Sequence, residues 1–534
     1  MWQCRAQSAI ALAKTATGLT ANAVTQAPDL DVAIIGAGIS GISMAAHIAR
    51  DCPGRRFAVL ERRAAVGGTW DLFRYPGVRS DSDMHTLGFG FAPWRGADAI
   101  ADGAAIRDYL NEVVAQHDLA QHIRTGTQVT AAEWDSTAAC WRLDWKTEGQ
   151  GGAQGTAGHL TARFLVLAAG YYDHDAAHDP ALPGQAEFAG PMVLPQFWPQ
   201  DLDVAGKRVV VIGSGATAAT LVPALAQRGA QVTMLQRTPT WFIASPRRDR
   251  LAHLLNRVLP APLAARLVRW RNIRLGAWFY NRARQAPGKV GAWLKRRAAR
   301  ALGPAWDEVA FTPPYGPWQQ RLCLVPDGDL FAAIRSGQAR VVTGRIARIE
   351  RDGISLENGG LENGGRLAAD VIVKATGLKL AVAGKIALRR DGVAINLADH
   401  LHYKDCMLSN LPNLVQVFGY LNASWTLRAD LVAAFTARVL NHMAQTGAQV
   451  ATPVLPADHG LEIDETPAFS SGYLLRGQHL LPRSSTERRW RLNHDYLSDR
   501  AFLRRDPLED GVLRFDHAPP RLAPWPDCAI DTPR

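Results

Sequence analysis

Two glycine-rich turns constrain this chain more than any other feature, because each stands between an apolar run and a helical pattern. At the first, residues 32–35 lead directly into Gly36, Gly38 and Gly41. Glycines at this spacing let the backbone approach the pyrophosphate of a dinucleotide, which rests on the positive end of the next helix. This stretch predicts a strand, a tight turn and a helix that bind one dinucleotide.

An acidic residue at a set distance strengthens this prediction. The next apolar run, FAVL, is followed by Glu61, twenty positions after Gly41. A carboxylate at this place accepts hydrogen bonds from a ribose hydroxyl. A glycine motif alone is weak, but the strand before it and the acid after it make the assignment specific.

The second turn repeats the pattern with one change. Residues 209–212 precede Gly213 and Gly215, Thr217 lies inside the turn, and Ala218 replaces the last glycine. We therefore expect a second bound dinucleotide.

The strand that follows the second turn ends in Arg237 rather than in an acid, and Thr238 comes next. A guanidinium binds a 2′-phosphate, whereas a carboxylate repels one, so the second nucleotide is expected to be NADPH. A surface ion pair is the alternative role of Arg237.

A chain that holds one dinucleotide and also uses NADPH is typical of a flavoprotein, so the first cofactor is expected to be FAD. The loop GGTWDLFRYPGVRSDSD, residues 67–83, is expected to return over the flavin ring. In this loop Gly68 allows close backbone approach, and Thr69 and Trp70 are candidate cofactor contacts. Asp81 remains as a polar group near the reacting atoms.

The length of 534 residues exceeds what one hydrophobic core usually serves. The predicted fold is α/β, with two Rossmann-like dinucleotide-binding domains, one for FAD and one for NADPH, the second inserted into the first, and with a basic helical insert. The expected divisions are a disordered leader at 1–29, the first segment of the FAD-binding domain at 30–170, the NADPH-binding domain with its linker at 171–377, its helical insert at about 247–310, and the second segment of the FAD-binding domain with the C-terminal region at 378–534.

The six cysteines are scattered and form no CxxC pair and no Cys/His cluster, so neither a metal site nor a disulfide framework is predicted. A flavin disulfide reductase would need a redox-active pair soon after the first glycine motif, but Cys52 and Cys140 lie 88 residues apart. The remaining use of a flavin reduced by NADPH is reaction with oxygen.

Positive charge is concentrated between Arg247 and Arg300, where fifteen Lys and Arg residues accompany one acid, Asp249. Together with several tryptophans, this charge indicates basic amphipathic helices, which suit peripheral membrane contact through residues 247–300. We favour the simpler alternative, a solvated helical insert that packs its aromatic side chains inward. No nucleic-acid motif accompanies the charge, so nucleic acid is not an expected partner.

The sequence contains no apolar run of eighteen residues, and Lys14 interrupts the short apolar stretch near its start. Neither a transmembrane span nor a signal peptide is predicted. The expected location is the cytoplasm, with the inner face of the membrane as the site of any peripheral contact.

Segments found in a fixed order, among them GAGISG, RYPGVRSDSD, IGSGATA, RLCLVPDGDLF and GYLNASWTLRADL, resemble those of the class B flavoprotein monooxygenases. More specifically, these segments resemble those of the Baeyer-Villiger branch of this family. That branch includes a mycobacterial monooxygenase that activates thioamide prodrugs such as ethionamide. The resemblance implies an FAD-containing, NADPH-dependent monooxygenase that acts through a C4a-peroxyflavin. Its substrates would be O2 and a small hydrophobic ketone, sulfide or thioamide.

The resemblance also implies residue roles. Arg321 would be a fixed positive charge beside the flavin, and Asp81 would orient it, because a peroxide anion needs a cation that cannot give up a proton. A structural ion pair is the alternative for Arg321. The other implied contacts are Arg237 and Thr238 for the NADPH phosphate and Asn422 and Trp425 over the flavin.

One position departs from the family. Its linker signature, Phe-x-Gly-x-x-x-His-x-x-x-Trp, is matched by Phe188, Gly190 and Trp198, but Leu194 replaces the histidine. The alternative function is therefore an uncoupled NADPH oxidase that releases hydrogen peroxide. A membrane-bound binding protein with a vestigial flavin is a third interpretation, and the retained nucleotide and flavin residues speak against it.

Overall fold

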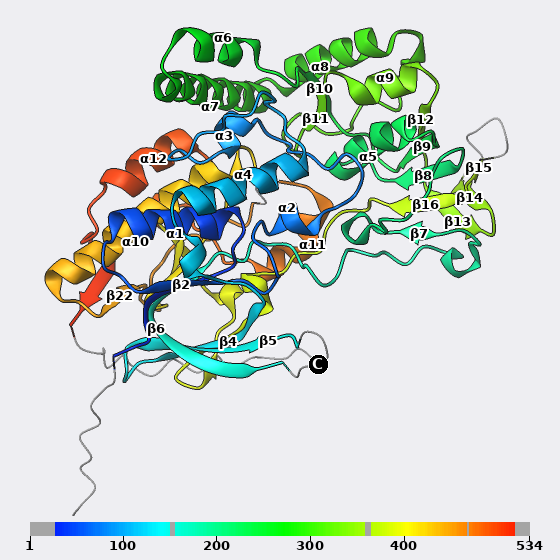
Figure 1. The fold of residues 1–534 in the computed structure, drawn as a ribbon. Coiled ribbons are helices and arrows are strands. Elements are labelled where there is room, and N and C mark those ends of the chain that lie inside the picture. Colours follow the sequence, from blue (N-terminus) through cyan, green and yellow to red (C-terminus); the bar gives the residue numbers. More distant parts are fainter. Residues whose placement is uncertain (1–26, 150–154, 358–364, 467–468, 518–534) are drawn as a thin grey trace, which may run out of the picture.

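The computed structural model describes residues 27–149, 155–357, 365–466 and 469–517 (Figure 1). The leader predicted for residues 1–29 lies outside these ranges except for its last three residues. Two sheets with parallel strands form the two halves of the molecule, and the helices of residues 250–302 lie along its upper edge in this view.

The larger sheet is built around β1 (Leu30–Ile35), which pairs in parallel with β2 (Phe57–Leu60) and β6 (Ala157–Leu167). The strand β6 is long enough to serve two partners on its other side. Its first half pairs antiparallel with β5, and its last three residues pair in parallel with β21. The full order is β18-β17-β4-β5-β6-β1-β2-β3, with β3 (Ile123–Arg124), β4 (Thr127–Asp135), β5 (Cys140–Thr147), β17 (Ala387–Arg390), β18 (Val393–Ala394) and β21 (Leu414–Gln416).

The strand β1 has a core on each of its faces, because successive side chains point to opposite sides of a sheet. Val32 and Ile34 join a core formed with the helices α1 (Ile39–Asp51) and α10 (Trp425–Thr446). Ala33 and Ile35 join a second core formed with the antiparallel strands β4 and β5. Both faces are covered, which explains why the run is apolar without alternation.

The smaller sheet has the order β12-β9-β8-β16-β7, and all of its pairs are parallel. Its strands are β7 (Met192–Val193), β8 (Arg208–Ile212), β9 (Gln231–Gln236), β12 (Ala339–Thr343) and β16 (Val371–Lys374). These strands lie in sequence between β6 and β17 of the larger sheet, as expected for an inserted domain. The helices α5 (Ala216–Gln227) and α9 (Asp329–Arg335) pack beside it.

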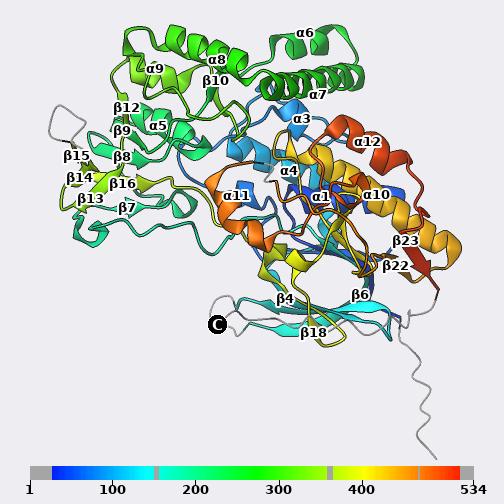
Figure 2. The ribbon, with the colours of Figure 1, turned by 180° about the vertical axis from the view of Figure 1, so that it is seen from behind.

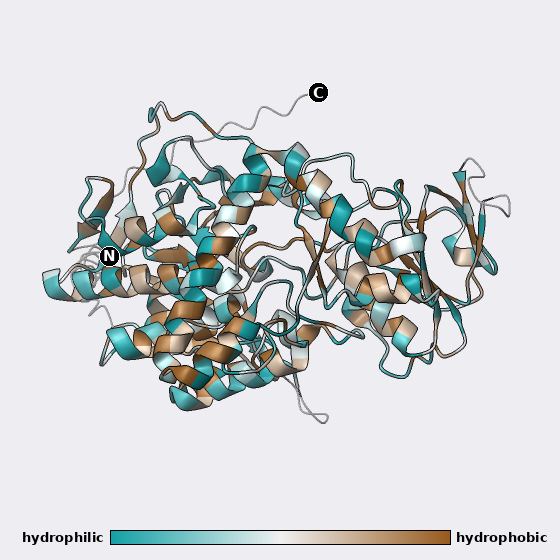
Figure 3. Ribbon diagram, turned by 90° about the horizontal axis from the view of Figure 1, so that it is seen from above, coloured by the Kyte–Doolittle hydropathy of each residue, from teal (hydrophilic) through white to brown (hydrophobic). Residues whose placement is uncertain are grey.

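The basic segment forms three helices, α6 (Arg250–Val258), α7 (Ala261–Gln285) and α8 (Pro287–Leu302). The preferred expectation that its aromatic side chains pack inward is wrong for Trp270 and Trp278, which are 56% and 64% exposed. Phe279 and Tyr280 do pack inward against neighbouring apolar clusters. Figure 3 views these helices from above and shows apolar and polar residues mixed along them.

Figure 2 shows the same arrangement from behind. Within the described ranges, no helix is long and apolar enough to cross a bilayer. The other helices and strands are α2 (Thr69–Leu72), α3 (Met84–Leu87), α4 (Gly103–Gln116), α11 (Gly472–Gly477), α12 (Tyr496–Arg505), β10 (Phe242–Ser245), β11 (Cys323–Pro326), β13 (Ile346–Glu350), β14 (Gly353–Leu356), β15 (Arg366–Ala368), β19 (His402–Tyr403), β20 (Met407–Leu408), β22 (Val450–Pro453) and β23 (Leu513–Asp516).

Candidate active site

The first glycine turn is shaped so that only glycine fits at two of its positions. Gly36 has φ of +101°, and a Cβ there would lie 2.9 Å from the carbonyl oxygen of Ala168. A Cβ on Gly41 would lie 1.8 Å from the Gly36 carbonyl oxygen. Gly38 is the N-cap of α1 and provides no side-chain cap. The first backbone N–H groups of α1 therefore stay available to an anion.

Glu61 lies at the end of β2, 5% exposed, and is held by two backbone donors. The N–H of Ala37 donates to Oε2 at 2.7 Å, and the N–H of Arg63 donates to Oε1 at 2.8 Å. Burial raises the pKa of this carboxyl group, and the two backbone donors oppose that rise. The carboxylate keeps free lone pairs for a ribose hydroxyl beside the glycine turn.

Gly36, Gly38 and Glu61 line a groove of about 320 Å³ that also reaches the other half of the molecule. Gly68, Thr69 and Trp70 of the predicted flavin loop form part of its wall, and Thr217 of the second turn and Arg321 also line it. The structure thus brings residues of both glycine motifs to one groove.

The loop of residues 67–83 begins against the first nucleotide motif. Gly68 has φ of +54°, and a Cβ there would lie 3.0 Å from the Cα of Gly38. Asp71 then fixes the turn, because it accepts hydrogen bonds from Arg63 and Arg74, each at 2.6 Å. The first aspartate of the loop is therefore a structural anchor.

The same loop continues onto the second nucleotide motif. A Cβ on Gly77, where φ is +74°, would lie 2.7 Å from the Cβ of Ala224 on α5. The side chain of Arg79 forms an ion pair with Asp329 at the start of α9. At its end, Asp83 caps α3 by accepting from the N–H of Thr86 at 3.1 Å. One segment therefore contacts both dinucleotide-binding units.

Asp81 and Arg321 form a two-point ion pair within this arrangement. Arg321 Nε lies 3.0 Å from Asp81 Oδ2, and Nη2 donates to Oδ1 at 3.1 Å. Burial lowers the pKa of the guanidinium, but Asp81 and nearby tyrosines outweigh that effect and raise it overall. The pair lines both the nucleotide groove and a larger cavity, so the cation stands where the two spaces meet.

Three tyrosines around this cation escaped sequence reasoning. Tyr171 and Tyr172 follow β6, and their hydroxyl oxygens lie 2.6 Å apart. Tyr473 of α11 packs near both rings. Burial is the main cause that raises the pKa of all three hydroxyls, so they remain protonated donors. The one sequence signal near them is Gly170, which precedes Tyr171 and indicates that a strand ends there.

The second glycine turn follows the geometry of the first. Gly213 has φ of +133°, and a Cβ there would lie 2.3 Å from the Ala375 carbonyl oxygen. Gly215 is the N-cap of α5, again without a side-chain cap, and Ala218 is fully buried. The N-terminus of α5 therefore also presents free backbone donors.

Arg237 and Thr238 follow β9, and neither lines the two cavities just described. Arg237 is exposed, and Arg476 of α11 approaches it from the C-terminal region of the chain. The Arg476 guanidinium lies beside Gly377, 3.5 Å from where a Cβ would be. Burial and the charge of Arg237 lower the pKa of Arg476. Within the described residues, neither arginine has a carboxylate partner, so two cations converge without an acid.

Asn422 and Trp425 flank the start of α10. Trp425 lines the nucleotide groove, donates its Nε1–H to Ser40 Oγ at 2.7 Å and stacks on Tyr171 at 5.2 Å. Asn422 instead lines the larger cavity and donates from Nδ2 to the His494 carbonyl oxygen at 2.8 Å. The two predicted flavin contacts therefore line different spaces: Trp425 lines the nucleotide groove, and Asn422 lines the larger cavity.

The larger cavity has a volume of about 1400 Å³ and adjoins the Asp81–Arg321 pair. Apolar side chains such as Phe279, Phe418, Leu421 and Leu474 make up much of its wall. A cavity of this size can take an apolar substrate much larger than a simple ketone.

Leu194 lies in the segment between the two units and is partly buried. Its carbonyl oxygen accepts from the N–H of Phe197 at 2.9 Å. The side chain of Phe197 is 46% exposed. The neighbouring Gln196 is buried and donates to the Asp173 carbonyl oxygen at 2.7 Å, which ties the linker to the groove.

Comparison with known proteins gives the family. Residues 33–257 match the family described as pyridine nucleotide-disulphide oxidoreductase. The chain is 44% identical to the FAD-containing monooxygenase EthA of Mycobacterium tuberculosis, over 92% of this chain and 98% of that protein. It is 41% identical to the probable FAD-binding monooxygenase AlmA of Acinetobacter baylyi, over 91% and 96%. The chain belongs to the FAD-containing monooxygenases.

Solved structures agree on the fold. An oxidised steroid monooxygenase bound to NADP has a TM-score of 0.71 and 21% identity, over 91% of this chain and 99% of that one. OTEMO in complex with FAD and NADP has a TM-score of 0.63 and 20% identity, over 80% and 87%. The predicted α/β fold with two Rossmann-like domains is confirmed, and it is the fold of Baeyer-Villiger monooxygenases.

The matched family's description includes disulphide chemistry, and no disulphide is present among the described residues. The cysteines in the described ranges, Cys52, Cys140, Cys323 and Cys406, are all free and buried. The groove does fit FAD, since a Cβ at Gly36 or Gly41 would fill the turn and Glu61 keeps acceptor capacity beside it. The chain is a flavin monooxygenase.

Proposed function

We propose that this protein is an NADPH-dependent, Baeyer-Villiger-type monooxygenase. It inserts one oxygen atom from O2 into a hydrophobic ketone or oxidises the sulfur of a sulfide or thioamide. The observation that carries this proposal is the Asp81–Arg321 pair at the junction of groove and cavity. FAD, when bound, supplies the electron transfer between NADPH and oxygen.

Arg321 provides positive charge where negative charge develops on oxygen. Its guanidinium keeps its proton near neutral pH, so it stabilises an anion without quenching it. Asp81 holds the guanidinium in one orientation through two contacts. The protonated hydroxyls of Tyr171, Tyr172 and Tyr473 supply further hydrogen-bond donors and exclude water from this corner.

The cofactor choice rests on positive charge at the second nucleotide motif. Arg237 at the end of β9, together with Arg476, favours a nucleotide that carries a 2′-phosphate. The free N–H groups at the start of α5 support a pyrophosphate at the same edge of the sheet. NADPH is therefore the proposed reductant.

The test is oxygen incorporation by the FAD-loaded protein. Long methyl ketones, alkyl aryl sulfides and thioamides are incubated with NADPH and isotopically labelled O2, and products are identified by mass spectrometry. We expect one labelled oxygen atom in the product for each NADPH consumed. The second candidate function is an uncoupled NADPH oxidase, because Leu194 replaces the family histidine. If peroxide formed in an amount equal to the NADPH consumed and no oxygenated product appeared, that function would be established instead.

We also propose that α6, α7 and α8 rest on an anionic membrane surface. Nine large apolar side chains on these helices are exposed: Leu251, Leu254, Val258, Leu263, Leu267, Trp270, Leu275, Trp278 and Trp293. Arginines accompany them, with Arg274 over the Trp270 ring and Arg297 over the Trp293 ring, each at 5.0 Å. Exposed apolar groups beside cations favour a negatively charged lipid interface.

Cosedimentation with vesicles tests this contact. We expect binding to vesicles that contain phosphatidylglycerol and little binding to pure phosphatidylcholine. Val258→Ser, at a site 64% exposed on α6, should weaken binding. Val393→Ser, at a site 60% exposed on β18, is the matched control. Equal binding by both variants and the unaltered protein would exclude this surface.

A further inference from the structure

One region of the large cavity is polar, and nothing in the proposed chemistry uses it. Three side chains define this polar recess: His402 of β19, Gln416 at the end of β21, and His494 just before α12. His402 and Gln416 are only 3% and 5% exposed. Polar groups buried to this extent normally have hydrogen-bond partners.

Three atoms of the recess have no such partner in the described ranges of the chain. These are His402 Nδ1, Gln416 Oε1 and His494 Nδ1. All three residues line the same cavity as Arg321. Polar side chains with unsatisfied atoms along one cavity indicate a binding surface for a polar group.

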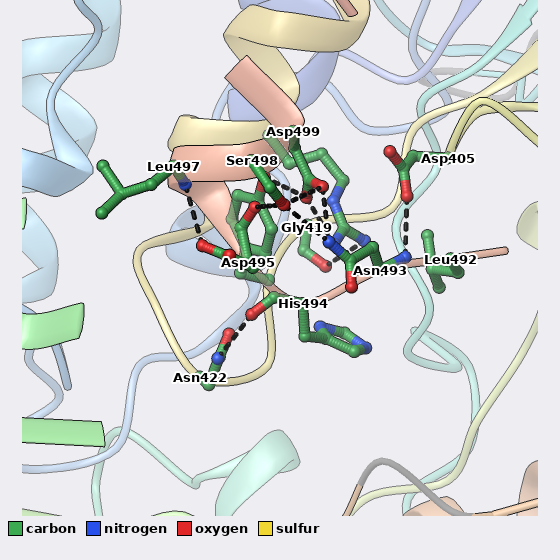
Figure 4. A network of polar contacts seen from close by, with 12 residues as sticks. Asp405, Gly419, Asn422, Leu492, Asn493, His494, Asp495, Leu497, Ser498 and Asp499 are labelled. Atoms are coloured by element: carbon green, nitrogen blue, oxygen red, sulfur yellow. Dashed lines mark hydrogen bonds and ion pairs between the residues drawn. The ribbon is translucent and has the colours of Figure 1, made fainter. Parts of the chain in front are cut away.

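A network of polar contacts surrounds His494 (Figure 4). Arg488 Nη2 donates to Asp405 Oδ2 at 3.0 Å and to Asp499 Oδ1 at 2.7 Å. Arg428 of α10, fully buried, lies 4.1 Å from the centre of the Tyr420 ring and 3.7 Å from Asp499. The carbonyl oxygen of His494 is held by Asn422, as the dashed line in Figure 4 marks. These contacts hold the backbone of His494 in place.

The charge state of the recess limits what it can bind. Burial, together with the nearby Arg428 cation, lowers the pKa of His402 to about 3 and the pKa of His494 well below its usual range. Both imidazoles are therefore neutral at pH 7, and each carries one donor and one acceptor nitrogen. The amide of Gln416 also offers both. The recess can therefore satisfy a group that both donates and accepts a hydrogen bond.

We propose that this recess binds an uncharged hydroxyl or primary amide on the substrate, separate from the carbonyl or sulfur that is oxidised beside Arg321. This inference rests on the proposed function and narrows its substrate class. The preferred substrates are amphipathic molecules, with an apolar body against Phe279, Phe418 and Leu474 and a second, neutral polar group.

A series of ketones with equal chain length tests the inference. It comprises a long methyl ketone and its counterparts with a terminal hydroxyl, carboxylate or ammonium group. Binding to the FAD-loaded protein is followed without NADPH through the change in flavin absorbance, and turnover is then measured. We expect the hydroxy ketone to bind about 3- to 10-fold more tightly than the plain ketone, the range for one net hydrogen bond.

Gln416→Leu is the informative variant, because leucine has similar bulk and no polar atoms. In this variant the hydroxy ketone and the plain ketone should bind with about equal affinity. The affinity for the plain ketone should stay nearly unchanged. His402→Asn keeps a polar side chain and should retain part of the preference. Gln449→Leu, at an exposed site outside the cavity, is the matched control.

The outcomes separate this inference from the function on which it rests. Equal binding of the plain and hydroxy ketones, or a preference that survives in Gln416→Leu, would overturn the inference even if both ketones are oxygenated. If the carboxylate or the ammonium ketone bound most tightly, the proposal that the bound group is uncharged would be overturned. Selective binding of the hydroxy ketone without oxygenated product would support the recess and contradict the monooxygenase proposal.

Discussion

Asp81 and Arg321 come from positions 240 residues apart and meet through two contacts of 3.0 and 3.1 Å. This pair is predicted to control oxygen transfer. Arg321→Ala should lower product formation by about 100- to 1000-fold, the usual cost of one stabilising donor at a developing anion. NADP⁺ binding, measured by titration calorimetry, should change little.

Asp81→Ala serves as the partner variant. It leaves the cation present but free to move, so product formation should fall less than in Arg321→Ala. Near-normal product yield in Arg321→Ala would mean that another group stabilises the developing charge.

The second prediction concerns nucleotide choice. Arg237→Ala should weaken the binding of NADPH by about 1.5–3 kcal/mol, as expected for the loss of a charge-assisted hydrogen bond. It should weaken the binding of NADH far less. Arg476→Ala should act in the same direction, because its guanidinium converges on Arg237 without an acidic partner. Dissociation constants of NADP⁺ and NAD⁺ for the oxidised protein are the measurement. Equal losses for both nucleotides would refute the assignment.

The third prediction concerns the loop of residues 67–83. Gly77→Ala adds a Cβ only 2.7 Å from that of Ala224, at φ of +74°. It should cost about 1–3 kcal/mol more stability than Gly126→Ala. The control has a similar φ of +66° but no atom within 4 Å of its Cβ position. Thermal unfolding measures the loss of stability in both variants. Equal losses would mean that the loop shifts to accept the added Cβ at little cost.

The fourth prediction concerns acid stability. His174 lies in the nucleotide groove, where burial and then Arg62 and Arg63 lower its pKa to about 4. Its neutral form is favoured by folding, so the folded state loses stability as the pH falls from 6.5 towards 4, by at most about 3 kcal/mol. His174→Asn should flatten this dependence in denaturant unfolding, whereas exposed His253→Asn should not. Parallel profiles would contradict this expectation.

The fifth prediction concerns the linker. If the family histidine helps to hold the two nucleotide units together, Leu194 should make the enzyme release more peroxide. The ratio of peroxide formed to NADPH consumed, with a good substrate, should be high and should fall in Leu194→His. Tight coupling in the unaltered protein would show that the histidine is dispensable here.

Local patterns predicted the regions of this molecule that local geometry determines. The glycine turns and the acid after β2 recur at fixed spacings because a pyrophosphate and a ribose have fixed dimensions. Tyr473 and Arg476 carry no such spacing, since α11 reaches the site from the far end of the chain. The polar recess was equally invisible, because His402, Gln416 and His494 meet only after folding.

The exposure of Trp270 and Trp278 was missed for a related reason. A helix that is rich in both arginine and tryptophan has the same sequence pattern whether its aromatic side chains face a core or the surroundings. Only the contacts of the neighbouring elements decide between the two. The described structure leaves this face of α7 uncovered.

Helix α7 contributes exposed leucines and tryptophans to the surface and also contributes Ile273, Ala277 and Phe279 to the lining of the large cavity. One helix, about 10 Å wide, therefore borders both the surroundings and the cavity. A sparingly soluble compound dissolved in a bilayer beneath α7 would therefore need to travel only this distance to enter the enzyme. For such compounds, the concentration that governs turnover would be the one in the lipid phase rather than the one in water.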